Sequence, residues 1–301
     1  MNPADSLFVA IASVALLIGF SLNLLLMYLI IWKSPRSLTP YWVFLANTTI
    51  TQLLFAVVAL ISLPRVLSKD PYTIVIYLGV VQYMGERLSY ISYVGMTHLS
   101  LNCFISLMLS MVYRYFSIRY HQFTMRTSIV VCLAGYSLPL ILFLSCTNLK
   151  VSSDIDSNRP ILEGVVKDFE RYRMVVSTDI SSQPQVIALV IAMTLGIIPI
   201  YGALTLQSLI PLVSVIPAST VFCLTRFELV EDVAYSYLII PCLSLGCIAD
   251  PIVTIRCVLP YRRWILRICH MKSAGDVTSS IHEKSKSEHV DKGVRRIFLR
   301  H

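Results

Sequence analysis

Three polar side chains lie inside long apolar stretches of the sequence, namely Asn23, Asn47 and Asp250. Counted at ~1.5 Å per residue from the end of each stretch that adjoins basic residues, they lie at roughly 13, 9 and 12 Å, so they share one layer of a helical bundle. Two amides and a carboxylate can form hydrogen bonds or bind a water or a cation, and in hydrocarbon they need such partners. Either this layer holds helices together, or it is a switch with two arrangements below a ligand pocket.

Prolines mark the places where helices of this chain can bend. Pro251 directly follows Asp250. Because proline lacks a backbone donor, it frees a carbonyl and bends a helix at that point. The sequence therefore predicts a hinge next to the only acid that lies well inside an apolar stretch. Pro211 and Pro217 share another stretch and predict a second hinge, in a helix that can pivot.

A second candidate group lies in and just before the stretch 90–113. His98 and Asn102 are spaced i, i+4, so they share one helix face. If that face lines a cavity, these two side chains contact a ligand. The residues at the rim of the cavity would then be Glu86, Arg87, Tyr90 and Tyr93. The alternative is hydrogen bonding between helices, which a single histidine on a helix face would serve equally well.

A third group ends the same stretch, where Arg114 stands between Tyr113 and Tyr115. Such a trio can be a snorkelling flank in an aromatic belt, or it can hold an arginine that contacts a cytosolic partner in one conformation only. Residues 259–267 (LPYRRWILR) predict a basic amphipathic turn along the inner leaflet. Cys269 beside that turn is a candidate for palmitoylation.

The elements that must position these residues are membrane-spanning helices. Hydrophobic residues make up 56% of the chain and charged residues 14%, with a mean hydropathy of +0.71, whereas soluble domains carry about 25% charged residues. The apolar stretches have helix length and lack the ~10-residue alternation of a membrane barrel. The cysteines have no metal-site spacing, and no acid pair, metal set or nucleophile motif is evident. We therefore expect neither an enzyme nor a cofactor or metal.

Seven stretches are long enough to be spans: 6–32, 41–63, 90–113, 127–147, 184–200, 203–224 and 233–258. Two of them come from the block 184–224, which holds no Lys, Arg, Asp, Glu or His. A bilayer needs about 20 residues per helix, so this block is too long for one span and just long enough for two that turn at Pro199 and Gly202. Segment 72–85 is apolar but short, and we expect an interfacial loop piece there.

Basic residues set the orientation. Lys and Arg gather in the loops 33–40 and 114–126 and near the C-terminus, while the first five residues carry none. The positive-inside rule then places the N-terminus outside and the C-terminus in the cytosol, which needs an odd number of spans. The sequence thus predicts an all-α bundle of seven transmembrane helices over residues 1–270 and a disordered cytosolic tail over 271–301. Attraction to anionic membrane lipids explains the net charge of +8 without nucleic-acid binding.

Short motifs, in their order and positions, resemble those of the nematode serpentine chemoreceptors, and most of all class delta. They are residues 34–41 (SPRSLTPY), 45–48 (LANT), 113–115 (YRY), 206–211 (LQSLIP), 249–254 (ADPIVT) and 260–262 (PYR). The resemblance implies a G-protein-coupled receptor of seven helices in the cell membrane of sensory neurons, at their cilia. Its function would be chemoreception, with a small environmental molecule as ligand and a heterotrimeric G protein as partner.

The resemblance also implies roles for two motifs. Tyr113, Arg114 and Tyr115 would occupy the acid-Arg-Tyr position of rhodopsin-like receptors, where the G protein couples. Asp250 and Pro251 would occupy the Asn/Asp-Pro position of the last helix. The residue before Arg114 is a tyrosine, however, so the acid that usually pairs with this arginine is missing.

Two further departures from the family pattern concern the loops. The outer loops 64–89 and 148–183 hold no cysteine, so the common disulfide to the third helix cannot form. The basic loop between the fifth and sixth helices is absent, since one span follows the other almost directly. A receptor-like protein that folds but does not couple is therefore an alternative. A seven-helix small-molecule transporter is another, because Pro184-Gln185 resembles a pair in sugar carriers, although no internal repeat accompanies it.

Overall fold

The computed structural model describes the chain in separate ranges of residues. They are 3–35, 38–69, 72–119, 124–146, 172, 174–178, 214, 217–218, 220–221, 224 and 233–268. The expected span 184–200, most of the span 203–224, the tail 271–301, and the candidates Pro211 and Cys269 lie outside these ranges. Pro217 is described, as a half-buried helical residue.

Five long helices correspond to five of the expected spans. They are α1 (Pro3–Lys33), α2 (Thr39–Ser62), α3 (Glu86–Arg119), α4 (Met125–Cys146) and α8 (Ile239–Cys257). Among the described residues, four segments have the length and apolar composition to cross a membrane: Pro3–Lys33, Thr39–Ser62, Glu86–Tyr113 and Tyr235–Cys257. Within α4 the corresponding apolar helix, Met125–Ile141, is shorter. The helical character predicted for these stretches is confirmed.

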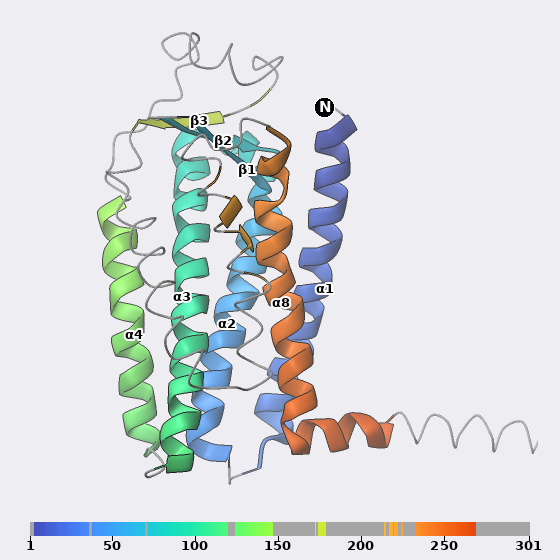
Figure 1. Cartoon of the computed structure of the whole chain (residues 1–301), viewed down its shortest axis with the longest axis vertical. Helices are drawn as coiled ribbons and strands as arrows, with labels where there is room; N and C mark the ends of the chain where they lie inside the picture. The colour runs from blue at the N-terminus through green and yellow to red at the C-terminus, as the bar shows by residue number, and fades with distance from the viewer. Residues whose placement is uncertain are drawn as a thin grey trace, which may run out of the picture. The chain divides into compact units, whose positions relative to one another are not determined.

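The helices of the first compact unit, which ends at Thr254, run side by side (Figure 1). Helix α2 contacts α1, α3 and α4, and α3 also contacts α4. Large apolar side chains of α1 remain exposed, such as Leu7, Ile11 and Val14. A helix that leaves such residues uncovered is stable where its surroundings are themselves apolar, as in a bilayer.

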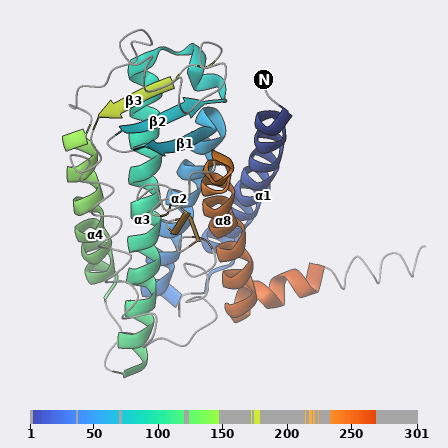
Figure 2. The same ribbon diagram turned by 45° about the horizontal axis from the view of Figure 1, so that its top comes forward.

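A three-stranded antiparallel sheet lies at the end of the bundle where α1 begins and α2 ends (Figures 1 and 2). Its strands are β1 (Pro64–Lys69), β2 (Tyr72–Tyr77) and β3 (Met174–Thr178), in the order β1-β2-β3. Pro64 pairs with Tyr77, and Ile76 pairs with Met174. The all-α prediction therefore holds for the five described long helices but misses this sheet.

The segment 72–85 is the clearest correction to the sequence analysis. Instead of an interfacial loop piece, it forms strand β2 and the short 3₁₀ helix η2 (Val80–Tyr83). The β-branched run Thr73-Ile74-Val75-Ile76 favours a strand. A strand also needs partners, and β3 lies about a hundred residues further along the chain, so local sequence gives no signal for the pairing.

The sheet is joined tightly to the end of α2. Leu63 ends the helix in a left-handed conformation, with φ of 37°, and its N–H donates to the carbonyl of Ala59. The N–H groups of Leu78 and Gly79 donate to the carbonyls of Leu63 and Ser62 at 3.3 and 3.1 Å. A Cβ at position 79 would lie 2.2 Å from the carbonyl oxygen of Ile61, so only glycine allows this approach.

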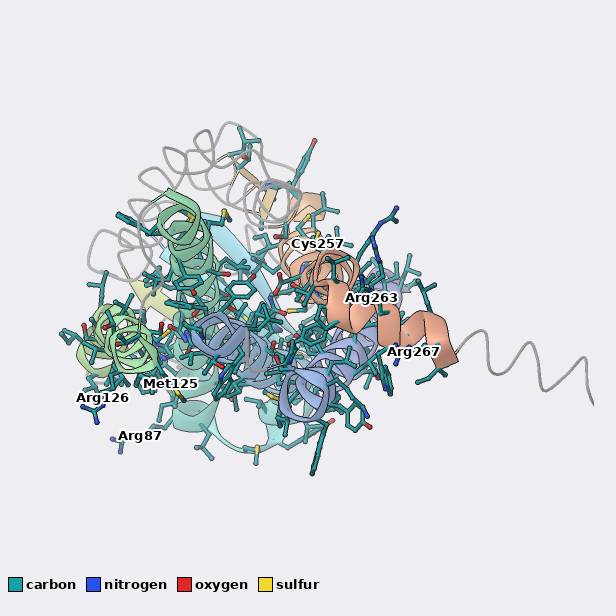
Figure 3. The ribbon with its side chains drawn as sticks, turned by 90° about the horizontal axis from the view of Figure 1, so that it is seen from below. Arg87, Met125, Arg126, Cys257, Arg263 and Arg267 are labelled. Carbon is teal, nitrogen blue, oxygen red and sulfur yellow. The ribbon has the colours of Figure 1, made fainter. Side chains whose placement is uncertain are left out.

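The second compact unit begins at Ile255, within the last turn of α8. Its described part contains a further helix over residues 259–268. Arg262, Arg263 and Arg267 on this helix are exposed, and Figure 3 shows the last two. A basic amphipathic segment was predicted here, and its helical form is observed. The expected domain boundary at residue 270 lies outside the described residues.

Candidate functional site

Asn23 of α1 bridges to the helix that carries Pro251. The asparagine is fully buried, and its Nδ2 donates to the carbonyl oxygens of Gly19 and Cys247, both at 2.9 Å. Cys247 precedes Pro251 by four residues, so its carbonyl has no helical N–H to accept from. Asn23 supplies the donor that the proline removes. Gly19 permits this contact, since a Cβ there would lie 3.0 Å from the Cβ of Cys247.

Asp250 is paired with a residue that the sequence analysis did not name. Gln52 of α2 donates from Nε2 to Asp250 Oδ2 at 3.0 Å, and both side chains are buried. The predicted α2 member of the layer, Asn47, instead donates to Ser106 Oγ of α3 at 2.7 Å. Counting residues gave the depth of Asn47 but not the direction in which it points. We call Asn23, Gln52 and Asp250 the inner polar layer.

Two amide oxygens of the inner polar layer are unpaired within the described residues. Asn23 Oδ1 and Gln52 Oε1 are buried and have no hydrogen-bond partner there. Most buried polar atoms in proteins are paired, and a polar group left unpaired in a buried network is costly. The two amides therefore keep acceptors that another arrangement of the layer could use.

The predicted pair on α3 faces two different helices. His98 Nδ1 lies 2.9 Å from the carbonyl oxygen of Pro139 in α4, and its Nε2 lies 3.3 Å from the hydroxyl of Tyr136. Asn102 Nδ2 donates to Thr51 Oγ1 of α2 at 2.8 Å. Both side chains are buried. The observed role is hydrogen bonding between helices, the alternative left open above, and a ligand-binding role stays a prediction.

The four predicted rim residues separate into two pairs. Glu86 and Arg87 are exposed at the start of α3, and Arg87 lies at the periphery in Figure 3. Tyr90 and Tyr93 are buried in the apolar core, together with Tyr77 of β2. Only the two tyrosines therefore occupy a position from which they could line an enclosed ligand site.

Tyr113 lies at the other end of α3, in an aromatic cluster. Its ring stacks on those of Tyr41 and Phe44 of α2, with centroids 5.8 and 4.9 Å apart. The side chains of Arg114 and Tyr115 lie outside what the structure describes. For these two residues of the predicted coupling motif, only their position in helix α3 is known. Arg126, in the first turn of α4, projects away from the helices of this unit (Figure 3).

A buried ion pair at the sheet end was missed by the sequence analysis. Arg65 of β1 donates to Asp5 Oδ1 at 3.2 Å and to Ser236 Oγ at 2.9 Å. Tyr172 and Tyr237 donate to the two oxygens of Asp5 at 2.5 and 2.6 Å. The guanidinium also lies 3.9 Å from the centre of the Tyr237 ring. We call these five residues the outer clamp.

The outer clamp joins segments far apart in the sequence. Asp5 belongs to the first turn of α1, Arg65 to the sheet, and Ser236 and Tyr237 to η6 (Val233–Tyr237), the 3₁₀ turn before α8. Asp5 is 1% and Arg65 7% exposed, so their charges are compensated almost entirely by each other and by hydroxyl groups. Arg65 is a charged residue inside the apolar run 63–67, and this was the available sequence signal that it has a buried acidic partner.

Comparison with known proteins places the chain in one family. The family model described as "Serpentine type 7TM GPCR chemoreceptor Srd" matches residues 8–203 and 201–267. Serpentine receptor class delta-33 of Caenorhabditis elegans is 55% identical, in an alignment that covers 93% of this chain and 92% of the relative. Serpentine receptor class delta-32 of the same organism is 35% identical over 87% of each chain. The family predicted from the motifs is confirmed.

The alignment with class delta-33 contains positions that are present in the relative but not in this chain. The alignment with class delta-33 extends over 313 positions but takes in only 93% of these 301 residues, so about 33 positions hold residues of the relative alone. The two segments matched by the family model meet at residues 201–203.

Proposed function

We propose that this chain, which belongs to the Srd family of serpentine seven-transmembrane chemoreceptors, is a G-protein-coupled receptor for a small environmental molecule. As a member of that family it is a multi-pass membrane protein. The observation that carries the proposal is the family match, which extends over nearly the whole of residues 8–267. The ligand would bind near the sheet and the G protein at the opposite end, around Tyr113, Arg114 and Tyr115.

The distribution of charge supports an orientation with the sheet outside the cell. Lys33 ends α1 and Arg126 lies in the first turn of α4, both at the end of the unit opposite to the sheet. Basic residues favour the cytosolic side of a membrane. The N-terminus would then lie outside and Arg114 at the cytosolic face.

The inner polar layer supports a switching role for α8. Asn23 donates to the carbonyl that Pro251 frees, and Gln52 donates to Asp250, while the oxygens of these two amides have no partner within the described residues. A helix held by an incomplete network next to a proline can move at small cost. A ligand that binds one arrangement of α8 more tightly would shift the balance between the two arrangements.

Nucleotide exchange tests the receptor proposal. The full chain would be expressed with heterotrimeric G proteins, and guanine-nucleotide exchange would be measured against a panel of volatile and water-soluble small molecules. We expect at least one compound to stimulate exchange in a saturable manner. An Asp250→Ala variant would be compared with the parent at matched surface expression, and its response to the compound should be altered. Exchange that no compound stimulates would contradict coupling.

A second candidate function is a receptor-like protein that folds and binds but does not couple. It is favoured by the break of the family match at residues 201–203 and by the roughly 33 positions found only in the relative. In the family pattern a basic loop joins the cytosolic ends of the fifth and sixth helices, and these positions would belong to it. Insertion of the corresponding segment of class delta-33 between Pro199 and Gly202 should then restore ligand-dependent nucleotide exchange. If parent and chimera respond equally, the short connection is not a defect.

A further inference from the structure

Tyr77 ends strand β2 and is the least exposed phenol at the sheet end of the bundle. Its side chain is 1% exposed. Its hydroxyl has no hydrogen-bond partner within the part of the chain that the structure describes. The backbone around it is fixed, because Tyr77 pairs with Pro64 and the next two residues are bonded to the end of α2.

Two further phenols of the same core interact electrostatically with Tyr77. Tyr90 and Tyr93 of α3 are buried in the same core cluster. Burial raises the pKa of Tyr77 well above its ordinary value, and the nearby Tyr93 and Tyr90 raise that pKa further. Buried tyrosine hydroxyls usually find a partner, and a buried polar group without one costs about 1–3 kcal/mol. A ligand that accepts a hydrogen bond from Tyr77 would account for this arrangement.

The surroundings of Tyr77 select for a neutral ligand. Alternation along the strands places Val75 and Val66 on the same face of the sheet as Tyr77. Arg65 falls on the opposite face, and its guanidinium already pairs with Asp5. An environment that disfavours a phenolate also disfavours a carboxylate ligand, since both bury an anion.

We propose that the Tyr77 hydroxyl donates a hydrogen bond to a carbonyl or ether oxygen of a neutral, otherwise apolar small ligand, bound between β2 and the first turns of α3. This rests on the proposed function, because it names the ligand class for the same receptor. Tyr90 and Tyr93 then line the site, whereas the exposed Glu86 and Arg87 do not. An aliphatic ketone has this chemistry, while an alkane lacks the acceptor and a carboxylate carries a charge.

The test compares three probes of the same ring size on the purified full-length chain. Binding of cyclohexanone, cyclohexane and cyclohexanecarboxylate would be measured by thermal shift and by titration in detergent. We expect cyclohexanone to bind most tightly. Tyr77→Phe should weaken its Kd about tenfold, which corresponds to about 1.4 kcal/mol. Tyr83→Phe is the matched control, because Tyr83 is 83% exposed, and it should leave the Kd unchanged.

The stability of the ligand-free Tyr77→Phe variant shows whether the substitution itself damages the fold. The substitution removes an unpaired hydroxyl and keeps the ring, so the ligand-free variant should be at least as stable as the parent. Equal cyclohexanone affinity in parent and Tyr77→Phe would overturn the proposal, and so would the absence of measurable cyclohexanone binding. Nucleotide exchange measured in parallel separates the two proposals. Tyr77-dependent binding without exchange contradicts coupling alone, and stimulated exchange that Tyr77→Phe leaves unchanged contradicts the Tyr77 contact alone.

Discussion

The outer clamp and the inner polar layer each bury one carboxylate, and each carboxylate accepts from a different kind of donor. Asp5 accepts from Arg65, Tyr172 and Tyr237, and its charge is compensated by a guanidinium. Asp250 accepts from the neutral amide of Gln52, whose oxygen has no partner among the described residues. The kind of partner, rather than burial alone, distinguishes a polar site held by an ion pair from one held by neutral groups.

This difference assigns separate tasks to the two ends of α8. The outer clamp ties the turn before α8 to α1 and to the sheet. It therefore connects the sheet to the helices in a chain whose segments 64–89 and 148–183 hold no cysteine. The inner polar layer holds the same helix near Pro251 through neutral amides. We infer that α8 is fixed at the end beside the sheet and can bend at its proline.

Removal of the clamp cation should have the largest effect. Arg65→Met leaves Asp5 buried without its counter-charge, so the free energy of unfolding should fall by about 3–5 kcal/mol. Thermal unfolding of the purified protein would measure this. Arg87→Met is the control, since Arg87 is exposed, and it should change stability by less than about 0.5 kcal/mol. Equal effects of the two substitutions would show that the clamp does not stabilise the fold.

The bond between Asn23 and Cys247 should have an intermediate effect that depends on Pro251. Asn23→Ala leaves a buried carbonyl unpaired and should cost about 1–3 kcal/mol. Pro251→Ala restores an N–H that the Cys247 carbonyl can accept from, so Asn23→Ala should cost at least about 1 kcal/mol less in that background. A double-mutant cycle of unfolding free energies measures the coupling. Additive effects would mean that Asn23 does not compensate for the proline.

A neutral replacement of the inner carboxylate should change stability least and the response to ligand most. Asp250→Asn keeps the shape of the side chain, removes its charge and replaces one acceptor oxygen by a donor. Unfolding free energy should change by about 1 kcal/mol or less, while the changed donor set alters the layer and lowers ligand-stimulated exchange. Unfolding and exchange would be measured on the same preparation. If Asp250→Asn lowered the free energy of unfolding as much as Arg65→Met does, the inner polar layer would stabilise the fold in the same way as the outer clamp.

Sequence reasoning found the helices because their signals are local. The predicted stretch 41–63 and the observed α2 (Thr39–Ser62) differ by two residues at one end and one at the other. Apolar length sets such a span, and the Pro35 to Pro40 segment marks its beginning. The depth of Asn23 and Asp250 and the hinge position of Pro251 follow from the same counting.

The partners of these residues could not be obtained in that way. Residue spacing places His98 and Asn102 on one face of α3, but it does not say that one meets α4 and the other α2. Gln52 rather than Asn47 pairs with Asp250 because the helices pack in one particular rotation. The clamp joins Asp5 to Arg65 across 60 residues and to Tyr172 across 167, and β3 pairs with β2 from about a hundred residues away. A single sequence carries no direct signal for such pairings.

The orientation of the chain is the claim on which the receptor account depends most. Epitope tags at the N-terminus and at the C-terminus would be probed with antibodies in intact and in permeabilised cells. The account predicts that only the N-terminal tag is accessible in intact cells, because an odd number of spans puts the basic C-terminal region in the cytosol. Accessibility of both tags in intact cells would establish an even number of spans and contradict the seven-helix receptor.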